Sequence, residues 1–382
     1  MTDPRVLLTG FPGFLGSALV ERLLERGDGP IACLVEPRYR DRAERRASAL
    51  TDDVGPNGKI RLHEGDITEP GLGINEVGQA FEGVEELYHL AAVYDLAVDA
   101  ELAERVNVHG TRNVLDVAET IDVDRFHYVS TCYVSGRYDG VFTEAHLQEG
   151  QSFNNHYEAS KYRAEVAVQE RMAAGLPATI YRPAIVVGDS ETGETDKYDG
   201  PYYLLSVLLA QPKWGSLLFT LPGSADAELN VVPRDFVVDA IAAIAAREDS
   251  IGEVYQLCDP SPLPVPVFLE RMADAADHRM VTLPTTKPVA RRVSRWLGAS
   301  GINVESAALD YLDHPTRYAC PNTRRALSGT EIEAPPFESY VDRLVEFATA
   351  GQLHDPKWRS TSSMAVEREL SSVDTVVKWL SS

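Results

Sequence analysis

A glycine-rich segment near the start of the chain restricts the fold more than any other feature of the sequence. The segment TGFPGFLG, residues 9–16, lies between an apolar run typical of a buried strand and a helical pattern with a leucine at every fourth position. Gly10 permits a tight turn, Gly13 lets backbone N–H groups approach a pyrophosphate, and Gly16 allows close packing of the helix on the strand. The N-terminus of that helix favours a bound anion. The segment therefore predicts a dinucleotide site that includes Thr9, Gly10, Gly13, Phe14, Leu15 and Gly16.

The first half of the chain alternates between strand-like and helical patterns. Strand-like runs cover residues 5–9, 31–35, 60–64, 86–90, 126–130 and 178–182, and helical patterns lie between them, notably over residues 103–118 and 157–174. This alternation is typical of βαβ units. It predicts an α/β fold with a doubly wound, parallel Rossmann sheet.

The pattern changes after Gly188, which indicates a second lobe. We expect a Rossmann dinucleotide-binding domain over residues 1–188, to which residues 230–258 return. Residues 189–229 and 259–354 are expected to form a smaller, mostly helical substrate-binding lobe. Residues 355–382 are expected to be a mostly polar tail, with at best a short amphipathic helix over residues 373–380.

The ends of the second, third and fourth strands suggest how a dinucleotide is bound. Glu36 ends the second strand, where a carboxylate can bind the adenosine ribose hydroxyls of NAD and would repel the 2′-phosphate of NADP. Arg38 and Arg40 follow and could hold that phosphate instead, so NAD(H) is favoured over NADP(H) without settling the choice. We expect the adenine at Asp66 and Ile67, with a turn aspartate as the alternative for Asp66. The small residues Ala91 and Ala92 leave room for the cofactor after the fourth strand.

The segment YEASK, residues 157–161, contains two residues that indicate acid–base catalysis. Tyr157 and Lys161 are four residues apart and share one face of a helix. A free tyrosine has a pKa of about 10, and a neighbouring ammonium lowers it toward a value useful in general acid–base catalysis. Thr131 follows a strand upstream, and its hydroxyl can donate to a substrate carbonyl; Ser130 is the alternative.

The order of these segments resembles that of the extended short-chain dehydrogenase/reductase family. The matching segments are residues 9–16, 66–67, 89–92, 107–111, 130–136, 157–161, 182–188 and 230–239, so that the resemblance covers roughly residues 4–260. Within the family, residues 33–35 (CLV), 65–73 (GDITEPGLG) and 128–131 (YVST) look most like the thioester-reductase, or fatty acyl reductase-like, branch.

The resemblance implies a role for each matching residue. Tyr157 would be the general acid/base, Lys161 would modulate its pKa, and Thr131 would polarise the carbonyl. Asn107 would lie near the nicotinamide, and the backbone at Pro183 and Ile185 would meet its carboxamide. The sequence departs from the branch at Glu36, where an arginine is common, and at Ser135, where the family usually has tyrosine. It also contains no carrier or adenylation domain of the kind found beside many thioester reductases, which weakens the case for a carrier-bound thioester.

These residues predict an NAD(P)-dependent oxidoreductase that moves hydride between nicotinamide and a carbonyl, an alcohol or an acyl thioester. Residues 202–209 are apolar and favour an apolar substrate, although they could equally form the core of the second lobe. One alternative is an NAD-dependent sugar-nucleotide epimerase or dehydratase, whose diphosphate would need several basic side chains. The sequence offers Arg291, Arg292, Arg295 and Arg317 for that purpose. A non-catalytic NAD(H)-sensing or scaffold protein is the alternative from another class.

The charge of the chain bears on its partners and surroundings. Its 382 residues carry a formal net charge of −22, which argues against nucleic acid as a partner. Only seven of the basic residues are lysine, a pattern that suits a salt-rich cytoplasm but also an acidic protein from a GC-rich genome. The four cysteines are widely spaced and suggest neither a metal site nor disulfides. With no signal peptide or long apolar run, we expect a cytoplasmic protein without a transmembrane segment, and the sequence is compatible with a homodimer.

Overall fold

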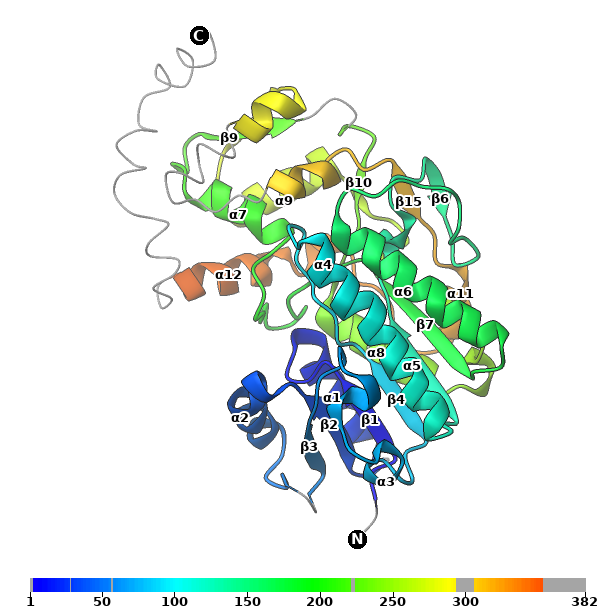
Figure 1. Cartoon of the computed structure of the whole chain (residues 1–382). Helices are drawn as coiled ribbons and strands as arrows, with labels where there is room; N and C mark the ends of the chain where they lie inside the picture. Colours follow the sequence, from blue (N-terminus) through cyan, green and yellow to red (C-terminus); the bar gives the residue numbers. More distant parts are fainter. Residues whose placement is uncertain (1–2, 28, 56–57, 221–223, 293–305, 353–382) are drawn as a thin grey trace. The chain divides into compact units, whose positions relative to one another are not determined.

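The computed structural model describes residues 3–27, 29–55, 58–220, 224–292 and 306–352, which fall into two compact units. Unit 1 comprises the described residues of Met1–Val186, Val232–Pro260 and Thr316–Ala334. Unit 2 comprises those of Val187–Val231, Ser261–Pro315 and Pro335–Ser382 (Figure 1). The helix expected at residues 373–380 and the side chain of Arg295 lie outside the described residues.

Unit 1 is built on the doubly wound parallel sheet that the sequence predicts. Its strand order is β12-β7-β5-β4-β1-β2-β3, and every neighbouring pair is parallel. The chain order reverses between β1 and β4, and the carboxyl ends of these two strands mark the place where open α/β sheets bind ligands. The strands are β1 Val6–Thr9, β2 Ile31–Val35, β3 Ile60–Glu64, β4 Glu86–His89, β5 Arg125–Val129, β7 Ala178–Pro183 and β12 Val254–Leu257.

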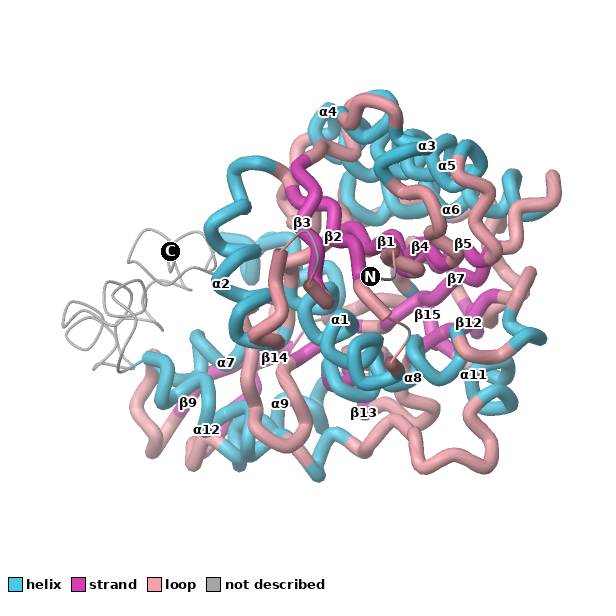
Figure 2. Tube along the Cα trace, turned by 90° about the horizontal axis from the view of Figure 1, so that it is seen from below, coloured by secondary structure: helices cyan, strands magenta, loops and turns pink. Residues whose placement is uncertain are grey.

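Helices cover both faces of this sheet (Figure 2). Residues of α1 Phe14–Arg26, α2 Arg40–Leu50 and α8 Arg234–Ala245 share one apolar cluster on one face. Residues of α5 Gly110–Thr120 and α6 His156–Ala173 share the cluster on the other face, against which α3 Val77–Ala80 also packs. Short segments of this unit include η1 Pro37–Tyr39, η2 Pro70–Gly73, α4 Ala100–Ala103, a π-helix η3 Glu104–His109 and η4 Cys132–Ser135. Strand β8 Ile185–Val187 pairs with β11 Val231–Pro233, and each of these strands has one residue, Val187 or Val231, in unit 2.

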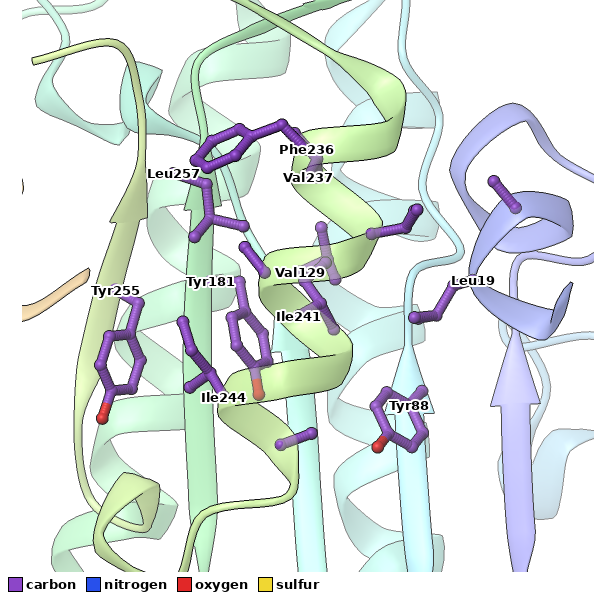
Figure 3. Close-up of a cluster of buried hydrophobic side chains, with 14 of the residues drawn as sticks. Leu19, Tyr88, Val129, Tyr181, Phe236, Val237, Ile241, Ile244, Tyr255 and Leu257 are labelled. Carbon is purple, nitrogen blue, oxygen red and sulfur yellow. The ribbon is translucent and has the colours of Figure 1, made fainter. Parts of the chain in front are cut away.

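Helix α8 illustrates why residues 230–258 return to the first unit. Val237, Ile241 and Ile244 recur at helical spacing and are fully buried. Figure 3 shows them directed at the sheet, among Val129 of β5 and Tyr181 of β7. Because one face of α8 is apolar, it covers the half of the sheet that α1 leaves open.

Residues 316–334 also belong to unit 1, whereas we expected them in the second lobe. Strand β15 Thr316–Tyr318 pairs in parallel with β6 Gly140–Phe142, and α11 Pro321–Ala326 follows. The Thr316 hydroxyl donates to the carbonyl of Tyr138 at 2.6 Å, and the Tyr318 and Ser135 hydroxyls are hydrogen-bonded at 2.9 Å. These pairings join segments far apart in the sequence, so no local pattern could reveal them.

Unit 2 contains the helices α7 Pro201–Leu209, α9 Val265–Ala275 and α12 Val341–Gln352. It also contains two small sheets, β9 Ser216–Thr220 with β14 Met280–Pro284 and β10 Glu228–Leu229 with β13 Leu263–Pro264. Its core includes Phe268, whose ring stacks on that of Phe337 at a centroid distance of 4.3 Å. Among the residues described for both units, no helix is long and apolar enough to span a membrane.

Candidate active site

The glycine-rich segment forms a compact turn between β1 and α1. Gly10 has a φ of +100°, a value that favours glycine, and a Cβ atom there would lie 2.9 Å from the amide nitrogen of Ala91. A Cβ atom on Gly13 or Gly16 would lie 2.6 Å or 2.4 Å from the carbonyl oxygen of Gly10. The last two glycines are therefore required by the turn itself, in addition to any role toward a ligand.

The N-terminus of α1 is left open to an anion. Gly13 is the N-cap, no side chain caps this end of the helix, and its first turn contains no acidic residue. The first intrahelical bond, from the amide of Ser17 to the carbonyl of Gly13, leaves the amides of the first turn without intrahelical acceptors. The guanidinium of Arg234 lies 5.1 Å from the centroid of the Phe14 ring, which begins this helix. Arg234 was not singled out from the sequence, because it is more than two hundred residues away from the glycine-rich segment.

Glu36 and the two arginines that follow it are engaged with one another or with other acids. The Arg38 Nε atom lies 2.6 Å from the Glu36 carboxylate, and both groups are at least one third exposed. Arg40 instead pairs with Glu44 at 2.7 Å and with Glu64 at 3.4 Å. Of the two arginines considered for a 2′-phosphate, only Arg38 touches Glu36 among the described contacts.

Asp66 and Ile67 lie in the loop after β3. One carboxylate oxygen of Asp66 accepts the amide of Thr68 at 2.8 Å, so the residue does stabilise a turn, as the alternative interpretation proposed. Ile67 is buried against Gly110, where a Cβ atom would lie 2.8 Å from its Cδ1. After β4, Ala91 is half-buried and Ala92 is exposed.

A capping interaction positions the tyrosine and the lysine at the start of α6. The Asn155 side chain accepts the amide of Glu158 at 2.9 Å, and the Glu158 carboxylate accepts the amide of Asn154 at 2.8 Å. Helix α6 therefore begins at His156, with Tyr157 in its first turn and Lys161 one turn later. Both side chains are buried, at 6% and 3% exposure. The ring of Tyr157 meets the ring of Tyr94 edge-on, at a centroid distance of 4.8 Å.

The Lys161 ammonium points at β5. It donates to the Tyr128 hydroxyl at 2.9 Å and to the Val129 carbonyl at 2.8 Å. Burial lowers the pKa of Lys161 to about 7, and the nearby Glu165 carboxylate opposes this shift. Glu165 is itself held by Arg182 at 2.6 Å in a fully buried ion pair.

The structure distinguishes the two hydroxyls that directly follow β5, those of Ser130 and Thr131. The Ser130 hydroxyl donates to the buried Glu165 carboxylate at 2.5 Å, so its hydrogen is already used. The Thr131 oxygen accepts the Tyr133 amide at 3.3 Å and lies 3.4 Å from the Pro183 carbonyl, a long and weak contact. Thr131 is therefore the hydroxyl with a hydrogen free to be redirected.

Asn107 lies inside the π-helix η3 and binds protein groups. Its side-chain oxygen accepts the Val93 amide at 2.9 Å, and its nitrogen donates to the Val93 carbonyl at 3.2 Å and to Ser160 at 2.9 Å. Ser160 in turn donates to the Tyr157 carbonyl at 2.9 Å. Both amide hydrogens of Asn107 are used, so this geometry ties the loop after β4 to the turn of α6 that carries Tyr157. Pro183 is buried at the end of β7, and Ile185 is half-buried in β8.

Two sets of residues were considered for substrate binding: the apolar residues 202–209 for an apolar substrate, and the arginines for a diphosphate. In α7, Tyr202, Leu205 and Leu208 are buried within this unit, while the other apolar side chains of residues 202–209 are not fully buried. The arginines weighed for a diphosphate are not gathered in one unit. Arg291 pairs with Asp310 at 3.0 Å in unit 2, whereas Arg317 is exposed on β15 of unit 1.

Comparisons with known proteins identify the family of the chain. Residues 8–241 match the family model described as male sterility protein, an NAD-binding family. A linear gramicidin synthase of Brevibacillus parabrevis is 27% identical over 381 residues, which covers 91% of this chain and 7% of that protein. Fatty acyl-CoA reductase wat of Drosophila melanogaster is 29% identical over 282 residues, which covers 64% of this chain and 54% of that protein. The chain thus spans only a small part of the gramicidin synthase and about half of the reductase.

Solved structures share the fold over nearly the whole chain. The terminal R domain from the myxalamid PKS-NRPS biosynthetic pathway superposes with a TM-score of 0.75 and 27% identity, covering 93% of both chains. UDP-glucuronic acid 4-epimerase from Bacillus cereus, solved in complex with NAD, has a TM-score of 0.65 at 16% identity, covers 92% of this chain and 99% of that one, and shows the fold alone. The chain belongs to the male sterility protein family, an NAD-binding family in the thioester-reductase branch of the extended short-chain dehydrogenases/reductases.

Proposed function

We propose that this protein transfers hydride between a nicotinamide cofactor and a carbonyl, an alcohol or an acyl thioester of an apolar substrate, with Tyr157 as general acid/base. The observation that carries the proposal is the buried pair of Tyr157 and Lys161 in successive turns of α6. The Lys161 ammonium is shielded from solvent and hydrogen-bonded at the end of β5, so it keeps a fixed position relative to the neighbouring side chains. This supports a catalytic role over a surface charge.

A dinucleotide fits the residues at the carboxyl ends of β1 and β4. The turn at residues 9–16 is packed around the Gly10 carbonyl, and the uncapped N-terminus of α1 suits a pyrophosphate. The Arg234 guanidinium over Phe14 adds positive charge near that end of the helix, in a chain whose overall charge is −22. The proposed contacts are Thr9, Gly10, Gly13, Phe14, Leu15, Gly16, Glu36, Arg38, Asp66, Ile67, Ala91, Ala92, Asn107, Tyr157, Lys161, Pro183 and Ile185. The bound nicotinamide supplies or accepts the hydride.

The chain's own residues handle the proton and the carbonyl oxygen. In the direction of reduction, Tyr157 donates its hydroxyl proton to the carbonyl oxygen as the hydride reaches the carbon. The Thr131 hydroxyl, released from its long contact with Pro183, donates a hydrogen bond to the same oxygen. Lys161 stabilises the tyrosinate that remains, because an ammonium favours a nearby anion. Asn107 donates to Ser160, which donates to the Tyr157 carbonyl, so Asn107 positions Tyr157. This role is additional to the place near the nicotinamide that the family resemblance implies for Asn107.

We further propose NAD(H) as the preferred cofactor and an acyl chain in the substrate. Glu36 holds Arg38 by an ion pair, so this arginine would have to leave the carboxylate before it could bind a 2′-phosphate. The acyl thioester is supported by the relative that is named a fatty acyl-CoA reductase. The apolar side chains of α7 that are not fully buried in unit 2 are compatible with such a chain.

The test is a panel of substrates with both cofactors. Loss of nicotinamide absorbance would be followed with NADH and with NADPH against long-chain aldehydes, ketones and acyl-CoA thioesters, and also against a sugar nucleotide. We expect turnover with at least one apolar carbonyl or thioester, faster with NADH. Conversion of the sugar nucleotide with no net consumption of cofactor would instead identify an epimerase or dehydratase.

A further inference from the structure

We propose that Tyr128 is a positioning residue that holds Lys161 in place. This inference rests on the proposed function, because it concerns the lysine assigned there to the proton chemistry. The sequence motifs and the family resemblance assign no role to the Tyr128 side chain. It is buried on β5 at 1% exposure, and Thr131 follows it by three residues, just after the end of this strand.

A series of hydrogen bonds in the neighbourhood of Lys161 links the glycine-rich turn with the Asn107 carbonyl. The Thr9 hydroxyl lies 2.7 Å from Nδ1 of His89, and Nε2 of His89 lies 3.0 Å from the Thr111 hydroxyl. The Thr111 hydroxyl donates to the Asn107 carbonyl at 2.6 Å, and the Tyr128 hydroxyl separately accepts from Lys161 at 2.9 Å. Thr9 and His89 are register partners on the adjacent strands β1 and β4, so the sheet itself aligns the first pair.

The direction of each bond in this series follows from the donors available. Thr111 has one hydroxyl hydrogen, and it donates this hydrogen to the Asn107 carbonyl at 2.6 Å. His89 must therefore donate its Nε2 hydrogen to Thr111, and its Nδ1 accepts from Thr9. The Thr9 oxygen then remains free to accept the Ala91 amide, as observed at 3.3 Å.

The Tyr128 hydroxyl oxygen accepts from the Lys161 ammonium at 2.9 Å, so a lone pair of this oxygen faces the lysine. Burial raises the pKa of Tyr128 well above its ordinary value, so this hydroxyl stays protonated and remains an acceptor for the lysine. Burial also lowers the pKa of His89 to about 3, which keeps the imidazole neutral with one donor and one acceptor.

The charged and titratable groups around Lys161 come from three elements. Glu165 and Tyr157 are on α6 with the lysine, Tyr128 is on β5, and His89 is on β4. Glu165 is already bound by Arg182 and Ser130, which limits its pull on the ammonium. The Tyr128 hydroxyl is therefore one of only two protein acceptors within hydrogen-bond distance of the Lys161 nitrogen among the described residues, the other being the Val129 carbonyl.

The test is a Tyr128→Phe variant, which removes only the hydroxyl. A Tyr181→Phe variant is the matched control, because Tyr181 is a fully buried tyrosine on the neighbouring strand β7 whose hydroxyl contacts His127 at 3.2 Å. The titration of Lys161 can be followed by NMR of labelled lysine side chains without any substrate. The chain has only seven lysines, and the Lys161 signal is identified by its loss in Lys161→Met.

We expect Tyr128→Phe to move the midpoint of the Lys161 titration down by about one pH unit, because an acceptor of the ammonium is lost. The alkaline limb of kcat/KM should move in the same direction, and turnover should fall about tenfold. Tyr181→Phe should leave the Lys161 titration unchanged. An unchanged Lys161 midpoint in Tyr128→Phe, or an equal shift in both variants, would overturn the proposal.

Nitrogen NMR of the His89 ring should show the hydrogen on Nε2, and a hydrogen on Nδ1 would contradict the assigned directions. The NMR readouts are independent of turnover, so a protein inactive toward the substrate panel would refute the proposed function without deciding this one.

Discussion

The ammonium nitrogen of Lys161 lies 2.9 Å from the hydroxyl oxygen of Tyr128 and is almost fully shielded from water. Burial lowers the pKa of this lysine to about 7, so the folded state releases a proton that an exposed lysine would keep to a pH of about 10.4. The same side chain thus affects both the stability of the fold and its proposed chemistry.

The first prediction concerns the pH dependence of stability. Between pH 7 and pH 10 the unfolded chain binds a proton at Lys161 that the folded chain does not, so the free energy of unfolding should rise with pH. Relative to Lys161→Met, the unaltered protein should gain about 1.4 kcal/mol for each pH unit over part of this range. Chemical denaturation of both proteins at several pH values measures the difference. A difference that stays constant over this range would show that Lys161 remains charged in the fold.

The second prediction concerns cofactor choice at the end of β2. Replacing Glu36 by alanine removes the carboxylate that would repel a 2′-phosphate and frees Arg38 from its 2.6 Å ion pair. We expect the ratio of NADPH to NADH affinity to rise about tenfold, which corresponds to about 1.4 kcal/mol. Isothermal titration of Glu36→Ala and of the double variant with Arg38→Ala separates the two effects. Glu85→Ala, which alters an exposed ion pair with Arg5, is the control. Tighter binding of NADPH by the unaltered protein would overturn the NAD(H) preference.

The third prediction separates the two hydroxyls at the end of β5. Ser130→Ala leaves the Glu165 carboxylate short of a donor in the core, so it should lower the free energy of unfolding by about 1–3 kcal/mol. Thr131→Val should instead lower turnover strongly with a smaller effect on stability, and Thr131→Ser should retain most of the activity. Denaturation curves and kcat of the three variants provide the comparison. A Ser130→Ala variant that loses turnover at unchanged stability would reverse the assignment.

The fourth prediction concerns salt. The net charge of −22 causes repulsion between acidic groups, and at about 1 M salt the screening length shortens to about 3 Å. If the chain is adapted to a salt-rich cytoplasm, its melting temperature should rise as KCl is added to molar concentrations. A melting temperature that falls steadily over the same range would exclude that adaptation.

The features that could be predicted from the sequence are those formed by residues close together in the chain. The turn at residues 9–16 and the pair of Tyr157 and Lys161 are local patterns, and βαβ alternation predicted the sheet. The contacts of Arg234, of Tyr128 and of the strand at residues 316–318 were missed because their partners are brought close only by the fold. The choice between Ser130 and Thr131 also needed the structure, because only the fold brings Glu165 of α6 to Ser130, which follows β5.

The central claim is that Tyr157 transfers the proton that accompanies hydride transfer. The most direct measurement is the single-turnover rate of nicotinamide oxidation by an apolar aldehyde or acyl-CoA, with the enzyme saturated with cofactor, in Tyr157→Phe and in Tyr162→Phe. Tyr162 lies on the same helix, half-buried against Phe153, and serves as the matched control. We predict that Tyr157→Phe binds the cofactor normally but reacts about 10²–10⁴-fold more slowly, while Tyr162→Phe reacts at close to the unaltered rate. A Tyr157→Phe variant that reacts as fast as the unaltered protein would contradict the account.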